Sequence, residues 1–366
     1  MVVIITSTIN VGADVPFLRL NNSKERLKQY IDALLFLFEQ NKDINYVVGD
    51  NSAAECPEII TEYVKKHSIG FEWVTFKGDE GKLKKYGKGY GEVEIIDYVI
   101  KHSKFLDKCD SFVKVTGRLK IRNFNTMIKS IKKKSNWFLT YGDGKLEKLD
   151  TRLYSMRIST WNECISNIYQ DVEYDDNSVE TIFVKKLSEN GEQISSFRVQ
   201  PNFIGQSGGY GAIYYTSIMD EILKTCRRYI ATIITPLYLE PDILWQGDMV
   251  IPDEVWMKVF SQLSNKKVFI CGLNTAGYRF FYSARNKCKI IGCSDRRYTG
   301  QKIAGQRIKK IETLRKKIAD YVVVAAMNDN TINEIEKQLT EMNYSRDKII
   351  SLKKIMNEHE CAYYLN

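Results

Sequence analysis

Short apolar runs alternate in the first part of the chain with longer segments whose apolar residues recur at helical spacing. Residues 2–8 predict a strand, residues 27–38 an amphipathic helix and residues 44–48 a second strand. This order is typical of a parallel α/β sheet, in which ligands bind beyond the carboxyl ends of the strands.

A third predicted strand, residues 110–115, leads into the turn Thr116-Gly117-Arg118. Glycine lets backbone N–H groups approach a phosphate closely, and a guanidinium can bind its oxygens bidentately. In a parallel sheet, Thr6, Asp50 and this turn would lie along one rim. The three polar strand ends therefore predict an anion site at that rim.

A second α/β segment begins near residue 264. Residues 268–278 predict a strand, a glycine turn and a helix, and further strands are expected at 289–295 and 319–326. The 366-residue length also favours two domains. We therefore predict a larger domain over residues 1–264 and a small Rossmann-like α/β domain over residues 265–366.

The second domain has a weaker claim to a ligand than to a fold. In the dinucleotide fingerprint the middle glycine is replaced by Asn274, whose side chain would crowd a pyrophosphate, although Asp295 stands where a ribose-binding acid is expected. No acid/base partner follows in so small a domain. A packing or docking role is favoured over cofactor binding.

Charge is distributed unevenly between the two predicted domains. The whole chain carries +9, whereas residues 265–366 hold 20 Lys and Arg against 10 Asp and Glu, which leaves the rest at −1. Such a basic region could contact anionic lipid headgroups or a lipid-linked acceptor, and a solvated helix face is the simpler interpretation. The basic residues lack the pattern of a nucleic-acid surface, so no nucleic-acid partner is expected.

Cysteine usage and hydropathy bear on location. The eight cysteines include no Cys-x-x-Cys pair, which is typical of reduced cysteines in the cytoplasm, and three histidines leave little for zinc chemistry. No apolar run of about 18 residues and no secretory signal is recognised. The expected location is cytoplasmic, with peripheral contact at the inner face of the membrane left open. The aromatic-rich tract 229–239 is expected to be core rather than a membrane anchor.

Several short motifs, in their order, resemble bacterial glycosyltransferases of the GT-A type from capsule and lipopolysaccharide gene clusters. They span about the first two thirds of the chain. The matching residues are 5–9 (ITSTI), Glu25, Arg26, Gln29, 49–52 (GDNS), 87–92 (GKGYGE), 114–118 (KVTGR), Asn123, 149–152 (LDTR) and 205–209 (GQSGG).

The resemblance implies a GT-A-like mixed sheet with flanking helices and a hexosyltransferase-like activity. A sugar would move from a nucleotide-sugar to a glycan or lipid-linked saccharide in surface polysaccharide synthesis, with no cofactor required. Thr6 and Asp50 would contact the nucleotide. Thr6 could instead cap the next segment, and Asp50 could form an Asx turn with Ser52.

The phosphate site departs from the family pattern. Many GT-A enzymes hold a divalent metal with an Asp-x-Asp motif after the fourth strand, whereas this chain has Val115-Thr116-Gly117-Arg118 there. An arginine cannot ligate a metal but can neutralise phosphate, here within a cradle of Thr116 and Gly117 and assisted by Lys114 or Lys120. Metal-independent transfer is therefore favoured. Arg118 could instead brace the fold by pairing with a carboxylate, and Asp143 and Asp150 are the fallback metal ligands.

A second element for donor binding is a glycine-punctuated loop containing Lys88, Gly89, Gly91 and Glu92, ahead of a helix expected from residue 93. Free N–H groups at a helix start attract anions, so the loop could close over the donor. An ordinary helix start is the alternative.

The candidate base is Glu180, in the first turn of a helix that Asp176 or Ser178 can cap. The resemblance places an acid facing the acceptor at this point. Asp175, Asp176 or no protein base at all are the alternatives, because acids also favour helix starts through the dipole.

Three other functions stay open at this point. A nucleotidyltransferase would need a glycine-rich, lysine-bearing turn after the first strand, which residues 6–10 lack. A nucleotide-sugar oxidoreductase or NAD(P)-binding protein would centre on the second domain, where Asn274 argues against it. A non-catalytic scaffold would use the basic C-terminal part.

Overall fold

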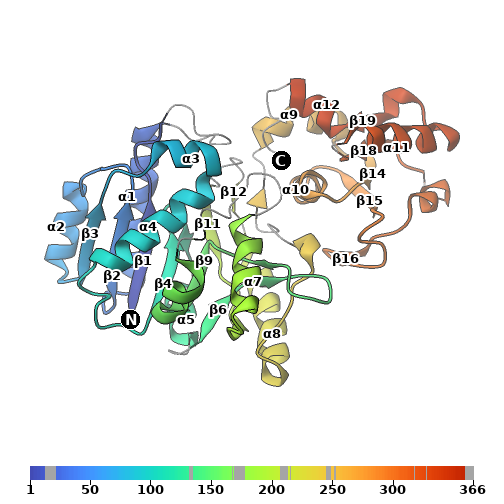
Figure 1. Ribbon diagram of the computed structural model, residues 1–366. Helices are drawn as coiled ribbons and strands as arrows, with labels where there is room; N and C mark the ends of the chain where they lie inside the picture. Colours follow the sequence, from blue (N-terminus) through green and yellow to red (C-terminus); the bar gives the residue numbers. More distant parts are fainter. Residues whose placement is uncertain are drawn as a thin grey trace. The chain divides into compact units, whose positions relative to one another are not determined.

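The computed structural model describes residues 1–12, 22–131, 135–166, 168, 178–206, 213–214, 216–244, 249–250, 253–316, 318–326 and 328–358. The chain divides into two compact units (Figure 1). The first comprises Met1–Gly208 with Tyr215–Asp242, and the second comprises Gly209–Tyr214 with Ile243–Asn366. The predicted boundary at residue 264 thus lies inside the second unit, between α9 (Asp253–Leu263) and β14 (Lys267–Cys271).

A seven-stranded sheet with the order β10-β6-β9-β4-β1-β2-β3 forms the centre of the first unit. β9 runs antiparallel to β4 and β6, whereas the other neighbouring strands are parallel. The sheet is therefore mixed. Its strands are β1 (Val2–Ser7), β2 (Asn45–Asp50), β3 (Phe71–Thr75), β4 (Ser111–Thr116), β6 (Asn136–Phe138), β9 (Leu153–Arg157) and β10 (Ile194–Ser196).

Helices cover both faces of this sheet. β1 is buried along its whole length, and alternate side chains of a strand point to opposite faces. Val2 and Ile4 pack in one core with Val93 and Phe183 of the helices α4 and α7. The helices of this unit are α1 (Ser23–Gln40), α2 (Glu58–Lys66), α3 (Glu80–Tyr86), α4 (Lys88–His102), α5 (Phe124–Ser130), α6 (Ile158–Thr160), α7 (Val179–Glu189) and α8 (Ile218–Ile234). The predicted α/β class, with a mixed sheet and flanking helices, is confirmed.

Shorter pieces complete the first unit. β5 (Lys120–Ile121) pairs antiparallel with β11 (Phe203–Gln206), and β7 (Thr140–Tyr141) pairs antiparallel with β8 (Lys148–Leu149). A π-helical turn follows α6 and contributes the fully buried Trp161 to the core.

The second unit contains a four-stranded parallel sheet with the order β15-β14-β18-β19. Phe269 and Val322 lie in its core with Leu339 of α11. This unit also contains a hairpin, β16 with β17, and the antiparallel pair β12 with β13. The bounds are β12 (Ile213–Tyr214), β13 (Met249–Val250), α10 (Thr275–Ala284), β15 (Lys289–Ser294), β16 (Lys302–Ile303), β17 (Gln306–Arg307), β18 (Tyr321–Val324), α11 (Asp329–Glu341), β19 (Ile349–Ser351) and α12 (Leu352–Glu358).

The glycine-punctuated loop is helical, which corrects the prediction. α4 begins at Lys88, so Gly89 and Gly91 lie in its first turn, and the break in the chain is at Gly87, where φ is +77°. A Cβ on Gly91 would come within 2.9 Å of the Leu83 Cδ1 atom. The glycine thus permits close packing of α3 on α4 and does not make a flexible loop.

None of the described helices combines the length and the apolar composition needed to cross a bilayer.

Candidate functional site

The predicted turn after β4 lies directly against the end of β1. The Gly117 N–H donates to the Thr6 carbonyl at 3.1 Å, and a Cβ on Gly117 would lie 2.5 Å from that oxygen and 2.9 Å from Cε1 of Tyr30. Glycine is therefore needed here for close approach. The structure brings Thr6 and Gly117 together as predicted, through backbone atoms.

Arg118 is buried, with 9% of its surface exposed, and Nη1 donates to Oε1 of Gln29 at 3.0 Å. Within the described part of the chain, no carboxylate forms an ion pair with Arg118. The alternative that this arginine braces the fold through a carboxylate therefore has no support among these residues. A guanidinium held in this way keeps donors for a ligand anion.

A second guanidinium, that of Arg26 in α1, is buried beside this turn. Its Nε donates to the Thr8 carbonyl at 2.8 Å, and Nη2 donates to the Tyr30 hydroxyl at 3.3 Å. Burial lowers the pKa of Arg26, and the charge of Arg118 lowers it further, while Tyr30 and Asp50 oppose this. The two like charges are thus close enough to interact, and an anion between them would relieve their repulsion.

Arg26 is among the motif residues, but the motifs assign it no role. Its burial beside Tyr30 is predictable from their spacing, because residues four apart lie on the same face of a helix, and both belong to the buried face of α1.

Asp50 has an internal role in this structure. Its Oδ2 accepts from the Ser7 hydroxyl at 2.8 Å and from the Ile9 N–H at 3.1 Å, and Oδ1 accepts from the Ser52 N–H, the Ser52 hydroxyl and the Ala54 N–H. The carboxylate is fully buried. It ties together the segments after β1 and β2, as in the Asx-turn alternative, and both oxygens are occupied.

Lys114 is fully buried beneath the turn. Its Nζ donates to Oε2 of Glu92 at 2.7 Å, to the Thr151 carbonyl at 2.6 Å and to the Thr116 hydroxyl at 3.0 Å. Burial lowers the pKa of Lys114, and the Glu92 carboxylate opposes that shift. All three ammonium protons are used, so Lys114 positions its neighbours, and among them Thr116 links it to the arginine turn.

Glu180 joins the same cluster from α7. The Thr151 hydroxyl donates to its Oε1 at 3.3 Å, and both Glu180 and Asp150 act on Lys114 electrostatically. The structure thus brings the predicted base to the edge of the sheet where the arginine turn lies. The other predicted acids, Asp175 and Asp176, lie outside the described residues.

The fallback metal ligands do not converge. The buried Asp150 accepts from Nε of Arg152 at 3.0 Å on both oxygens, whereas the exposed Asp143 accepts from the N–H of Asp242 at 3.3 Å. In the described ranges, no three His, Cys, Asp or Glu side chains are grouped as a metal site. Asp143 and Asp150 thus do not form a site for a divalent ion.

Lys120, which was expected to assist Arg118, lies over the Phe36 ring, with Nζ 5.8 Å from the ring centroid.

In the second unit, the polar side chains at the turn after β14 form hydrogen bonds within the turn and with its neighbours. Asn274 caps α10 by accepting from the Gly277 N–H at 3.0 Å, and Oδ2 of Asp295 accepts from the Leu273 N–H at 2.7 Å. A Cβ on Gly277 would lie 2.1 Å from the Gly272 carbonyl oxygen. The acid expected for a ribose thus closes the turn, which favours the packing role.

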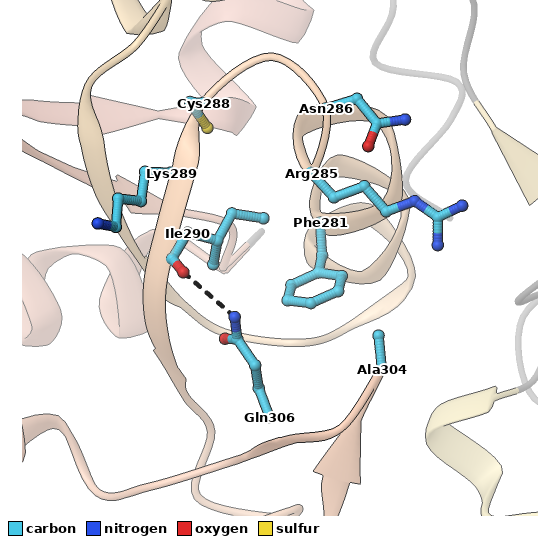
Figure 2. A pocket seen from close by; sticks show the side chains of 8 residues that line it. All are labelled: Phe281, Arg285, Asn286, Cys288, Lys289, Ile290, Ala304 and Gln306. Carbon is cyan, nitrogen blue, oxygen red and sulfur yellow. Dashed lines mark hydrogen bonds between the residues drawn. The ribbon is translucent and has the colours of Figure 1, made fainter.

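A shallow pocket of the second unit lies elsewhere. Figure 2 shows it between the end of α10 and the start of β15, where Nε2 of Gln306 donates to the Ile290 carbonyl at 3.1 Å. The exposed side chains of Arg285 and Lys289 line it. Because Lys289 and Ile290 begin β15, the pocket is at the amino end of that strand, away from the edge where ligands of parallel sheets bind.

Comparison with known proteins gives only distant likenesses. No protein-family model matches the chain, and no curated protein is similar to it in sequence. The mannosyltransferase Ktr4p from S. cerevisiae is 10% identical, with 65% of this chain and 82% of that chain covered and a TM-score of 0.37. Galactosyltransferase LgtC, solved with donor and acceptor sugar analogues, is 12% identical over 54% and 74%, with a TM-score of 0.35. Glycosyltransferase GlyE of Streptococcus pneumoniae TIGR4 is 9% identical over 99% of both chains, with a TM-score of 0.33. Likenesses at this level carry no weight for fold or function, which rest on the residues above.

Proposed function

We propose that this protein is a glycosyltransferase that moves a sugar from a nucleotide-sugar donor to a glycan or lipid-linked saccharide. The observation that carries the proposal is Arg118, a buried guanidinium at the carboxyl edge of a mixed α/β sheet with no carboxylate partner among the described residues. A diphosphate supplies the missing negative charge.

The chemistry of sugar transfer requires stabilisation of the leaving diphosphate. In this proposal Arg118 binds its oxygens, Gln29 holds the guanidinium in place, and the nearby charge of Arg26 adds to the field at the leaving group. Two guanidinium groups take the part that a divalent metal plays in many GT-A enzymes, so transfer proceeds without a metal.

An inverting enzyme also needs a base for the acceptor hydroxyl. Glu180 is the proposed base, with its carboxylate held by the Thr151 hydroxyl, and Lys114 balances the charge of Glu92 and Glu180 beneath it. The alternatives remain Asp175, Asp176 or no protein base at all. We assign the role in surface polysaccharide synthesis from the resemblance of the motifs, and peripheral membrane contact from the basic second unit.

The test is calorimetric titration of nucleoside diphosphates and nucleotide-sugars into wild type and Arg118→Ala, each with EDTA and with manganese. Loss of charge-assisted hydrogen bonds of roughly 1.5–3 kcal/mol should weaken binding roughly 10- to 150-fold. Arg296→Ala is the matched control, because this arginine is exposed in the second unit and pairs with Glu334 at 3.1 Å.

Binding that persists in EDTA and is lost in Arg118→Ala alone supports the proposal, and donor hydrolysis with acceptor screening then identifies the reaction. Equal affinity of wild type and Arg118→Ala would refute the role of Arg118. Stabilisation by NAD(P) alone would move the functional centre to the second unit, and binding of neither class of ligand would favour a scaffold.

A further inference from the structure

Helix α8 packs on the first unit with its polar side inward. Arg228 is fully buried, with Nη2 donating to Oε1 of Glu240 at 3.1 Å and Nε donating to Oε1 of Gln200 at 3.0 Å. On the same side, Glu221 accepts from Nδ2 of Asn202 at 2.6 Å. An amphipathic helix on a protein surface ordinarily buries its apolar side, so this orientation is reversed.

The apolar side of α8 faces outward. Eight large apolar side chains of this helix are each 50% to 88% exposed, which corrects the expectation that the tract from Tyr229 onward is core. They are Ile218, Met219, Ile222, Leu223, Tyr229, Ile230, Ile233 and Ile234, and we call them, together with the exposed Cys226, the α8 stripe.

The α8 stripe is larger than monomeric proteins usually tolerate. Its exposed fractions amount to about five whole side chains, or on the order of 700 Å². The largest apolar patch of a typical monomer is about 300–600 Å². The stripe is also close to the roughly 800 Å² that each partner contributes to a standard protein interface.

The stripe is symmetric about Cys226, the middle residue of the helix. Ile222 and Ile230 stand four residues before and after it, and Ile218 and Ile234 stand eight residues before and after. A twofold axis through an antiparallel helix pair requires such a pattern, since each residue before the centre then meets one after it. We propose that α8 pairs with α8 of a second copy, antiparallel about an axis near Cys226.

The charges beside the stripe also favour a second copy over a bilayer. Interfacial helices carry Lys and Arg along the polar face next to the headgroups. Here Lys224 and Arg227 lie along one border together with Asp220, and the other border is occupied by buried polar contacts of the first unit. Basic residues thus line one border only, and they share it with an acid, whereas the polar face of an interfacial helix is rich in Lys and Arg.

The experiment is sedimentation velocity over a range of concentrations on wild type, Ile222→Glu and Ile59→Glu. Both isoleucines are 50% exposed, but Ile59 lies on α2, so its variant controls for the added charge. Because a buried unpaired carboxylate is costly, Ile222→Glu should weaken the dimer at least roughly 100-fold while Ile59→Glu stays dimeric. Circular dichroism should show both variants folded, since both sites are exposed.

Cross-linking tests the geometry separately. A short bis-maleimide should join two copies through Cys226 in wild type, and Cys226→Ser should abolish the product. A monomer at every concentration, or a dimer that Ile222→Glu leaves intact, would overturn the proposal. The proposal would also be overturned if a monomer binds anionic phosphatidylglycerol vesicles and Ile222→Glu abolishes that binding. The α8 stripe would then be assigned to a membrane. The outcome is independent of donor binding at Arg118.

Discussion

The carboxyl edges of the two sheets differ in how their polar groups are satisfied. In the second unit Asn274 caps a helix and Asp295 binds the turn beside it, so the polar groups serve the fold. In the first unit Arg118 is buried with a single amide partner and no carboxylate among the described residues. A glycine turn at the end of a strand thus has its polar groups bonded within the protein in the second unit, whereas in the first unit it leaves a charge for a ligand.

This difference shows which feature distinguishes a ligand-binding edge of a parallel α/β sheet from an edge with a structural role. Glycine turns and polar strand ends occur at both edges, because the fold itself requires them. The distinguishing feature is a buried charge that the protein does not compensate, since such a charge is costly until an anion is bound.

The largest expected effect is on turnover at the first edge. Glu180→Gln removes the proposed base and should lower kcat by roughly 10²- to 10⁴-fold, with little change in donor affinity. Once the donor is known, steady-state kinetics measure this. Glu189→Gln at the exposed end of the same helix is the control. Unchanged turnover in Glu180→Gln would return the base to Asp176 or to no protein group.

The next effect is on stability. Lys114→Met leaves Glu92 without its partner and the Thr151 carbonyl without its donor, and should reduce the free energy of unfolding by about 3 kcal/mol. Lys289→Met, at an exposed strand position of the second sheet, should change it by less than about 0.5 kcal/mol. Urea denaturation measures both. Equal effects would mean that the buried ion pair at the first edge does not stabilise the fold.

A smaller effect is the pH dependence of the free energy of unfolding, which has opposite signs for one buried group in each sheet. Burial raises the pKa of the Cys271 thiol from 9.0 to about 12, so the folded protein holds this proton more tightly than the unfolded chain. The contribution of this thiol to the free energy of unfolding is therefore fully present below pH 9. Above pH 9 it falls by about 1.4 kcal/mol per pH unit. Lys114 has the opposite sign, because burial lowers its pKa and stability rises with pH as the ammonium loses its proton.

Urea denaturation at pH 8 to 10 on wild type and Cys271→Ala isolates the thiol. The variant should lose less stability than wild type on going from pH 9 to pH 10. Parallel curves would show that this thiol titrates normally. Cys288, whose pKa burial raises to about 11, adds a similar slope to both proteins and cancels in the comparison.

The smallest effect is expected at the carboxyl edge of the second sheet, where the polar groups are bonded within the protein. Asp295→Asn weakens acceptance from the Leu273 and Arg297 N–H groups and should cost about 1 kcal/mol of stability, with diphosphate affinity unchanged. Calorimetry and thermal unfolding measure the two quantities. Lost diphosphate binding in this variant would remove the distinction between the two edges.

Local signals in the sequence are enough to predict the arginine turn and the strands β1, β2, β4, β14, β15 and β18. Buried parallel strands are continuous apolar runs, and a Gly-Arg pair at a strand end needs no knowledge of distant residues. The start of α4 could not be predicted in this way. Two glycines weaken its first turn by about 1 kcal/mol each, and the packing that favours the helix comes from Leu83 and Asn51.

Distant partners explain the other differences. The spacing in α8 shows an apolar stripe but not which side is buried, since that depends on Gln200 and Glu240 in other segments. Likewise, the local pattern at Asp50 suits both an Asx turn and a ligand contact. The hydrogen bonds from Ser7 and Ile9, more than forty positions away, complete the occupation of its carboxylate.

The contact between Gly117 and the Thr6 carbonyl has a consequence for biosynthesis. The arginine turn takes its shape against the first strand, so the proposed anion site cannot form until the ribosome has made the chain past residue 118 and β1 has paired with β4. In the proposed function, a bound donor would then stabilise the pairing of Thr6 with Thr116 in two strands that are separated along the chain by four helices and two strands among the described residues. Nascent chains would then become resistant to proteases earlier in cells rich in nucleotide-sugar.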